Sequence, residues 1–189
     1  MNSKIFLLAF LCLAIVSNSQ LTNNDAVYAA QINMALPNLK FDLGNGNFIR
    51  IANGVLVEKS GPFVAATLSQ KFLNGDFNND GFIDAAVILN VVYDGIGYWN
   101  NFVFVVLQNY QTGPVVTNGI TVGEVAISQI DTFSTDIDNK KIILQFKDRL
   151  PGQPKVVAPS VPTLLKLKVN AGALVQDSKT TGTVACYPF

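Results

Sequence analysis

The sequence predicts a mainly β protein whose antiparallel sheet is packed as a sandwich or strongly curled as a meander, with at most a short N-terminal helix. The first observation behind this prediction is that short segments rich in Val, Ile, Phe and Tyr recur along the chain, as strands require. The second is that turn sequences such as Asn53-Gly54 separate these segments, and Asn-Gly between apolar runs is a strong local indication of a hairpin. The third is that the four prolines within 151–162 exclude a helix from this connector.

Taken in order, the expected elements begin with the segment from Asp25 to Leu36, which could form a short helix capped by Asn24 or a loose N-terminal arm. The strands expected after it are 39–43, 47–52, 55–58, 64–73, 85–93, 101–108, 124–130, 132–137, 141–147, 163–169 and 173–176. The segment 101–108 is apolar at every position from Phe102 to Leu107. Because both of its faces would then be buried, it is expected to be a central strand.

The N-terminal segment has the pattern of a secretory signal peptide, since Lys4 precedes an apolar run that ends at Val16 and small polar residues follow. The run is shorter than the roughly 20 residues that a membrane-spanning helix needs. We therefore expect cleavage after Ser19, export to the periplasm or the outside of the cell, and no stable membrane insertion afterwards. The expected organisation is a signal peptide (1–19), an N-terminal arm (20–35), a β domain (36–177) and a C-terminal tail or edge strand (178–189).

The composition restricts the chemistry that the chain can perform. It has 13 basic and 13 acidic residues and no basic run that would neutralise phosphates, which argues against nucleic-acid binding. It contains no histidine, so Ser-His-Asp and Cys-His catalysis are excluded in their usual form. Cys186 is the one cysteine that would remain after signal cleavage, because Cys12 lies in the signal segment. No internal disulfide is therefore expected.

The most specific pattern is a D-x-N-x-D-G-x-x-D loop at 76–84, in which alternate residues point oxygens at a hard cation. Its expected calcium ligands are the side chains of positions one, three, five and nine and the carbonyl of position seven: Asp76, Asn78, Asp80, Asp84 and Phe82. Gly81 provides the sharp turn. Val87 stands where an EF-hand has its closing glutamate, and a β-branched run follows, so we expect the loop to join two strands. The alternative is a solvated turn that binds no ion.

The loop resembles the calcium loop of FG-GAP propeller blades, but a single copy cannot build a propeller. More broadly, the order of the loop, the Gly-rich Asp94-Gly95-Ile96-Gly97-Tyr98, the apolar strand after it and Gly152-Gln153-Pro154 before a final hairpin resembles a group of uncharacterised exported bacterial proteins with one such loop. The likeness spans Leu36 to Gln176. It implies an exported single domain and does not imply a particular activity.

Two further sets of residues are candidates for binding or catalysis. Tyr93, Tyr98, Trp99 and Tyr110 could present an aromatic platform for a glycan or peptide, although such residues in strands usually pack in the core. A glycosidase would need two carboxylates at a fixed separation, and its candidates are Glu58, Glu124 and Asp94. The sequence thus favours an exported, non-catalytic, calcium-stabilised β-module with a binding or structural role, and the alternative is a small acid-residue hydrolase supported by the loop.

Overall fold

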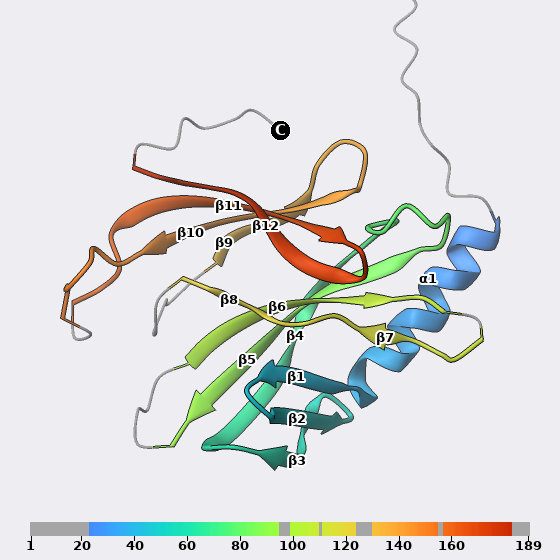
Figure 1. Ribbon diagram of the computed structural model, residues 1–189, viewed down its shortest axis with the longest axis horizontal. Coiled ribbons are helices and arrows are strands. Elements are labelled where there is room, and N and C mark those ends of the chain that lie inside the picture. The colour runs from blue at the N-terminus through green and yellow to red at the C-terminus, as the bar shows by residue number, and fades with distance from the viewer. Residues whose placement is uncertain (1–22, 95–98, 110, 124–129, 155–156, 183–189) are drawn as a thin grey trace, which may run out of the picture.

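The computed structural model describes residues 23–94, 99–109, 111–123, 130–154 and 157–182, and its architecture is mainly β, as the sequence predicts. The described residues form a short α-helix, a 3-10 turn and two antiparallel sheets, whose arrangement can be followed in Figure 1. The elements are α1 (Asn23–Ala35), η1 (Leu36–Asn38), β1 (Lys40–Gly44), β2 (Asn47–Ala52), β3 (Val55–Ser60), β4 (Phe63–Gly75), β5 (Asp84–Tyr93), β6 (Trp99–Leu107), β7 (Val115–Val116), β8 (Ile120–Val122), β9 (Ile130–Thr135), β10 (Lys141–Asp148), β11 (Val161–Asn170) and β12 (Ala173–Thr181).

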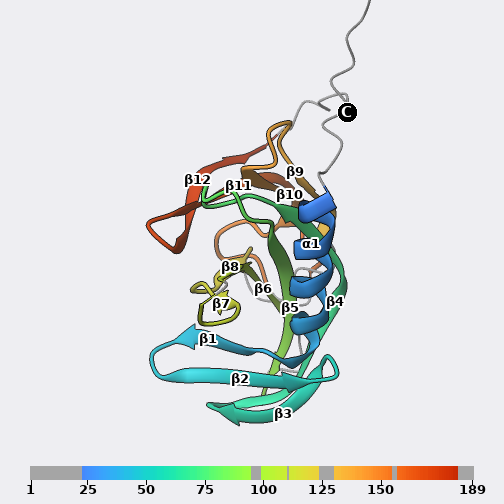
Figure 2. The ribbon, with the colours of Figure 1, turned by 90° about the vertical axis from the view of Figure 1, so that its right-hand side faces the viewer.

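The larger sheet has the order β1-β2-β3-β4-β5-β6-β7, and β8 also pairs with β6. It curls until it is nearly closed like a barrel, with β1, β2 and β3 turned under the remaining strands (Figure 2). The smaller sheet has the order β12-β11-β10-β9 and lies across one side of the larger sheet (Figure 1). Consecutive strands are neighbours almost throughout, which is the meander that the regular spacing of turns predicts.

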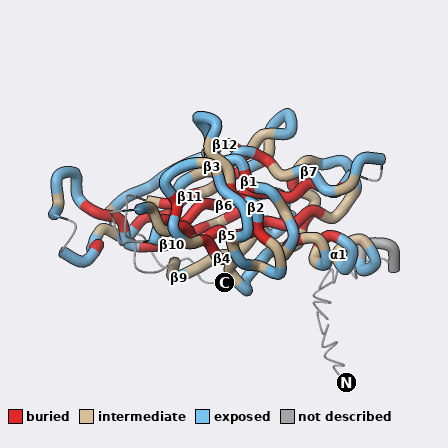
Figure 3. Tube along the Cα trace, turned by 90° about the horizontal axis from the view of Figure 1, so that it is seen from below, coloured by how far each residue is buried: buried red, intermediate tan, exposed pale blue. Residues whose placement is uncertain are grey.

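Strands β5 and β6 lie at the centre because they are apolar on both faces. Alternate residues point to opposite faces of a strand, so these two strands contribute to two separate cores. One core includes Val87 and Phe104 and lies inside the curled sheet, where Ile32 of α1 completes it. The other includes Ile88 and Val105 and lies between the two sheets. Figure 3 shows that the buried segments run through this middle layer of the molecule.

The hairpins follow the predicted positions closely, and several ends differ by one to three residues. β12 continues to Thr181 as an edge strand of the smaller sheet, past the expected domain boundary at 177. β7 and β8 were not expected from the sequence, because two and three residues are too few to show a periodicity. They are strands because they pair with β6, which no local pattern indicates. Of the expected strand 124–130, Ile130 begins β9, and the remaining residues lie outside the described part of the chain.

Candidate functional site

The predicted loop joins β4 to β5, and Gly75 and Asp84 face each other as the last cross-strand pair before it. The site therefore occupies the end of a hairpin, as expected from the strand-like sequence after it. Gly75 is buried, and a Cβ atom at this position would lie 2.5 Å from the backbone oxygen of Asn139. The base of the loop is thus pressed against the β9–β10 turn of the other sheet. This close approach leaves no room for a side chain.

Three of the predicted ligand residues form one hydrogen-bonded network. The carboxylate of Asp76 accepts the backbone N–H of Asp80 at 3.0 Å and that of Gly81 at 3.1 Å. The amide of Asn78 donates to the Asp80 carboxylate at 2.7 Å, and its oxygen accepts the Asp80 N–H at 3.1 Å. The Asp80 carboxylate also accepts the backbone N–H of Phe82 at 2.9 Å. All of these bonds lie within the loop, and together they hold the side chains of Asp76, Asn78 and Asp80 in place.

The backbone conformation of the loop explains its residue types. Asn79 has φ of 60° and Gly81 has φ of 86°, and asparagine and glycine adopt this left-handed region more easily than other residues. Each carboxylate oxygen has two lone pairs, so an oxygen that accepts one N–H can still bind a cation. Asp76 and Asn78 are half-buried and Asp80 is exposed, so solvent ions can reach these oxygens.

Asp84 takes a different place from the other predicted ligands. Its side chain is fully buried, and its two oxygens accept the backbone N–H of Phe77 at 3.0 Å and of Gln108 at 2.9 Å. Burial raises the pKa of this carboxyl from 3.8 to about 7, and the two N–H donors oppose that rise. The charges of Asp80 and Asp76 add to the increase. Asp84 thus ties the loop to the end of β6 from the inside.

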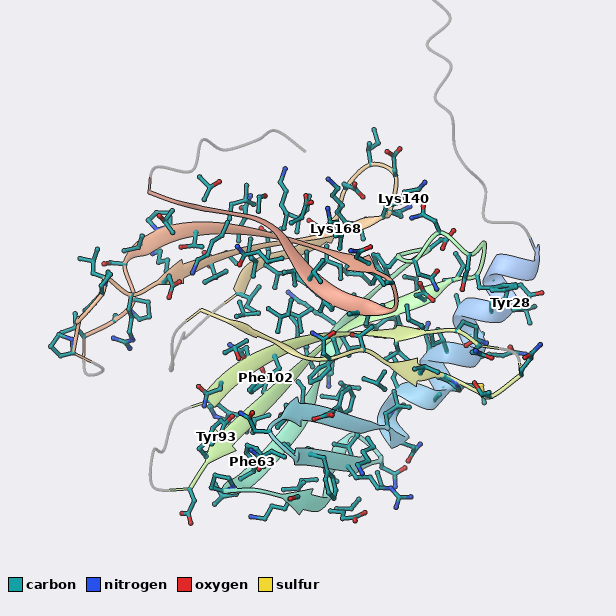
Figure 4. The ribbon with its side chains drawn as sticks, in the orientation of Figure 1. Tyr28, Phe63, Tyr93, Phe102, Lys140 and Lys168 are labelled. Carbon is teal, nitrogen blue, oxygen red and sulfur yellow. The ribbon has the colours of Figure 1, made fainter. Side chains whose placement is uncertain are left out.

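The loop is also connected to helix α1. The rings of Tyr28 and Phe82 meet edge to face with centroids 6.0 Å apart, and Figure 4 shows Tyr28 on the helix at this end of the molecule. The side-chain amides of Asn33 and Asn74 donate to each other, at 3.4 and 3.2 Å. Asn74 also donates to the backbone oxygen of Asp84 at 3.2 Å. These contacts join residues far apart in sequence, so no local pattern could have indicated them.

The structure therefore brings Asp76, Asn78 and Asp80 together, places the Phe82 backbone beside them and turns Asp84 inward. Within the described ranges, no group of three or more His, Cys, Asp or Glu side chains is arranged to hold a metal ion. A cation at the loop would rely on two carboxylates, one amide oxygen and one backbone carbonyl. This oxygen-only set fits calcium, which accepts carbonyl and amide oxygens together with carboxylates and water.

The aromatic and acidic candidates are dispersed. Tyr93 packs against Phe63 with ring centroids 4.8 Å apart, and Figure 4 shows the two rings together at the lower end of the curled sheet. Burial raises the Tyr93 pKa.

Among the other candidates, Trp99 is 45% exposed. Outside the described part of the chain lie Tyr98, Tyr110, Glu124 and Cys186. Glu58 is exposed 3.5 Å from Arg50, and Asp94 is exposed in a turn.

The fold and the loop define a mainly antiparallel β protein with a self-bonded Asp/Asn-rich loop between the two long strands of its larger sheet. The chain matches no family model, no curated protein and no solved structure. Across the described residues, none of the helical segments has the length and apolar character needed to cross a membrane.

Proposed function

We propose that the protein is an exported β-module that binds one calcium ion at the loop 76–84 and uses it to stabilise a structural or binding role in the cell envelope or outside the cell. Asp76, Asn78, Asp80 and the Phe82 carbonyl are the proposed ligands. Asp84 fixes the shape of the loop from behind and adds negative charge there when it is ionised. The observation that carries this proposal is the hydrogen-bonded network that holds the first three side chains together.

The electrostatics of the loop favour a cation. Among the described residues, neither Asp76 nor Asp80 forms an ion pair with a lysine or arginine. Two carboxylates in one short loop repel each other, and Asp84 behind them increases the repulsion when it is ionised. A divalent cation would remove this repulsion. Because the loop already has its turn conformation, little ordering entropy would oppose binding.

The expected stabilisation follows from mass action. Extracellular calcium modules have dissociation constants of roughly 10⁻⁴ to 10⁻³ M. About 10 mM calcium would then stabilise the folded state by roughly 1.4 to 2.7 kcal/mol. For a domain of this size, this corresponds to an increase in melting temperature of about 3 to 10 °C.

The test is a pair of thermal melts of the mature protein, one with about 10 mM calcium and one with a chelator. Asp80→Ala should abolish the difference between the two melts. Asp138→Ala is the matched control, because Asp138 is an exposed aspartate in the β9–β10 turn, outside the loop. Equal melting temperatures of the wild type in calcium and chelator would refute the proposed site.

Export is tested separately by the intact mass of the protein from culture fractions. We expect a chain that begins near Gln20 and carries one thiol, at Cys186. A mass of the full 189 residues in every fraction would contradict export with signal cleavage.

A further inference from the structure

A second polar site lies between the two sheets, away from the calcium loop. It is a pocket of about 270 Å³. Its described lining comes from β4, β5, β6 and β9: Ser69, Lys71, Ile88, Asn90, Asn101, Ile130 and Phe133. Small-molecule pockets begin at roughly 300 Å³, so this one suits a single ring with its substituents.

The pocket lies at an irregularity of β4. Leu68 pairs with Leu89 and Phe72 pairs with Val87, so the three residues between them on β4 face one residue, Ile88, on β5. A bulge of this kind bends the strand and redirects its side chains, and bulges are common beside binding sites. Ser69 and Lys71, which are two positions apart on the bulged segment, both line the pocket.

Two amides in the pocket lack protein partners. Asn90 and Asn101 are directly opposite each other on β5 and β6. Asn101 is only 8% exposed, yet within the described part of the chain its side chain forms no hydrogen bond, and neither does that of Asn90. Neither amide has a fully buried atom without a partner, so both keep contact with solvent in the pocket. A ligand in the pocket would replace this water and meet two adjacent amides, each of which offers donors and an acceptor.

The remaining lining narrows the ligand class. Each carboxamide can donate to one hydroxyl and accept from another, which matches neighbouring hydroxyl groups on a ring. Phe133, Ile88 and Ile130 supply an apolar wall for the C–H face of such a ring. Lys71 forms no ion pair among the described residues and is the one charge in the described lining, so a single negative charge on the ligand would be favoured.

We propose that this pocket binds a sugar ring that carries one carboxylate, a hexuronate unit. Asn90 and Asn101 hydrogen-bond its neighbouring hydroxyls, Lys71 pairs with its carboxylate, and Phe133 covers its apolar face. Ser69 accepts the backbone N–H of Lys71 at 3.2 Å, and its own O–H remains able to donate to the ligand. The site shares no residue with the proposed calcium loop, so either proposal can fail without the other.

The test is a nuclear magnetic resonance titration of the mature protein, at constant calcium, with D-galacturonate and D-glucuronate and with galactose and glucose as neutral counterparts. We expect a uronate to shift the side-chain amide signals of Asn90 and Asn101 with millimolar affinity. Asn101→Val should weaken binding at least tenfold, and Lys71→Met should remove the preference for uronate over the neutral sugar.

Asn100→Val is the matched control. Asn100 directly precedes Asn101 on β6 and is 4% exposed, but it faces the other side of the sheet and is not in the described lining of the pocket. The Asn100→Val variant should therefore bind uronate like the wild type. Asn101→Val should also fold with undiminished thermal stability, because it removes an unpaired amide and places a strand-forming residue there. No shift of the two amides with any of the four sugars, equal binding of neutral sugar and uronate, or equal loss in Asn100→Val would overturn the proposal.

Discussion

Replacing Asp84 with alanine should remove a large part of the stability of the protein. The change leaves the backbone N–H groups of Phe77 and Gln108 without their acceptor, and the site is closed to water because Asp84 has no exposed surface. A buried donor left unpaired costs about 1–3 kcal/mol, so the two together should cost about 2–6 kcal/mol. This is a substantial part of the 5–15 kcal/mol that typically separates folded and unfolded states.

Asp84→Asn should cost less, because its amide oxygen can still accept one of the two N–H groups. We expect a loss of about 1–3 kcal/mol for the donor that then faces the NH₂ group. Both variants should be measured by urea denaturation with a chelator present, so that no ion contributes. Asp138→Ala, in the exposed turn between β9 and β10, should remain within about 0.5 kcal/mol of the wild type.

The same residue gives the stability a predictable dependence on pH. The folded-state pKa of Asp84 is about 7 against 3.8 for the free side chain, so between these values the folded protein holds a proton that the unfolded chain has released. Stability from this group should be complete below about pH 4 and decline as the pH rises through about 7, by on the order of a few kcal/mol. Asp84→Asn should lack this decline. An alanine variant within about 1 kcal/mol of the wild type, or an unchanged pH slope in the asparagine variant, would refute this description of the site.

Two further outcomes are expected. Gly75→Ala should lower the melting temperature, because its methyl group would lie 2.5 Å from the backbone oxygen of Asn139. Gly81→Ala should cost only the strain of its positive φ, because its methyl group would meet no atom within 4 Å. A larger loss of melting temperature in Gly81→Ala than in Gly75→Ala would contradict the close packing of the sheets at Gly75. Asp177 bridges lysines of β10 and β11, which lower its pKa to about 2, so its contribution to stability should be present above about pH 4 and disappear as the pH falls through about 2. Asp177→Asn should flatten the acid unfolding curve in that range, and an unchanged curve would show that the pair adds nothing.

Much of the fold could be predicted because its determinants are local. Alternation of apolar residues and Asn-Gly turns locate most of the hairpins, and the unbroken apolar run after Asn101 predicts a central strand. β7 and β8 were missed because they exist through pairing with β6 and have no pattern of their own. The curl of the larger sheet into a nearly closed shape and the division into two cores also depend on contacts between distant strands.

The candidate site divides in the same way. The grouping of Asp76, Asn78 and Asp80 could be predicted, because the spacing within one loop determines it. The inward position of Asp84 could not, since one of its partners, Gln108, is 24 residues away in sequence, at the end of the neighbouring strand β6. The pocket between the sheets was missed entirely, because its polar side chains come from three separate strands.

Isothermal titration of calcium into the chelator-treated mature protein tests the central claim most directly, because it counts the ions and measures their affinity without depending on unfolding. We expect one calcium ion per chain with a dissociation constant of roughly 10⁻⁴ to 10⁻³ M. Asp76→Ala should remove this binding, because Asp76 supplies a carboxylate ligand and anchors the backbone of the loop. No heat of binding in the wild type, or binding that persists unchanged in Asp76→Ala, would contradict a calcium site at this loop.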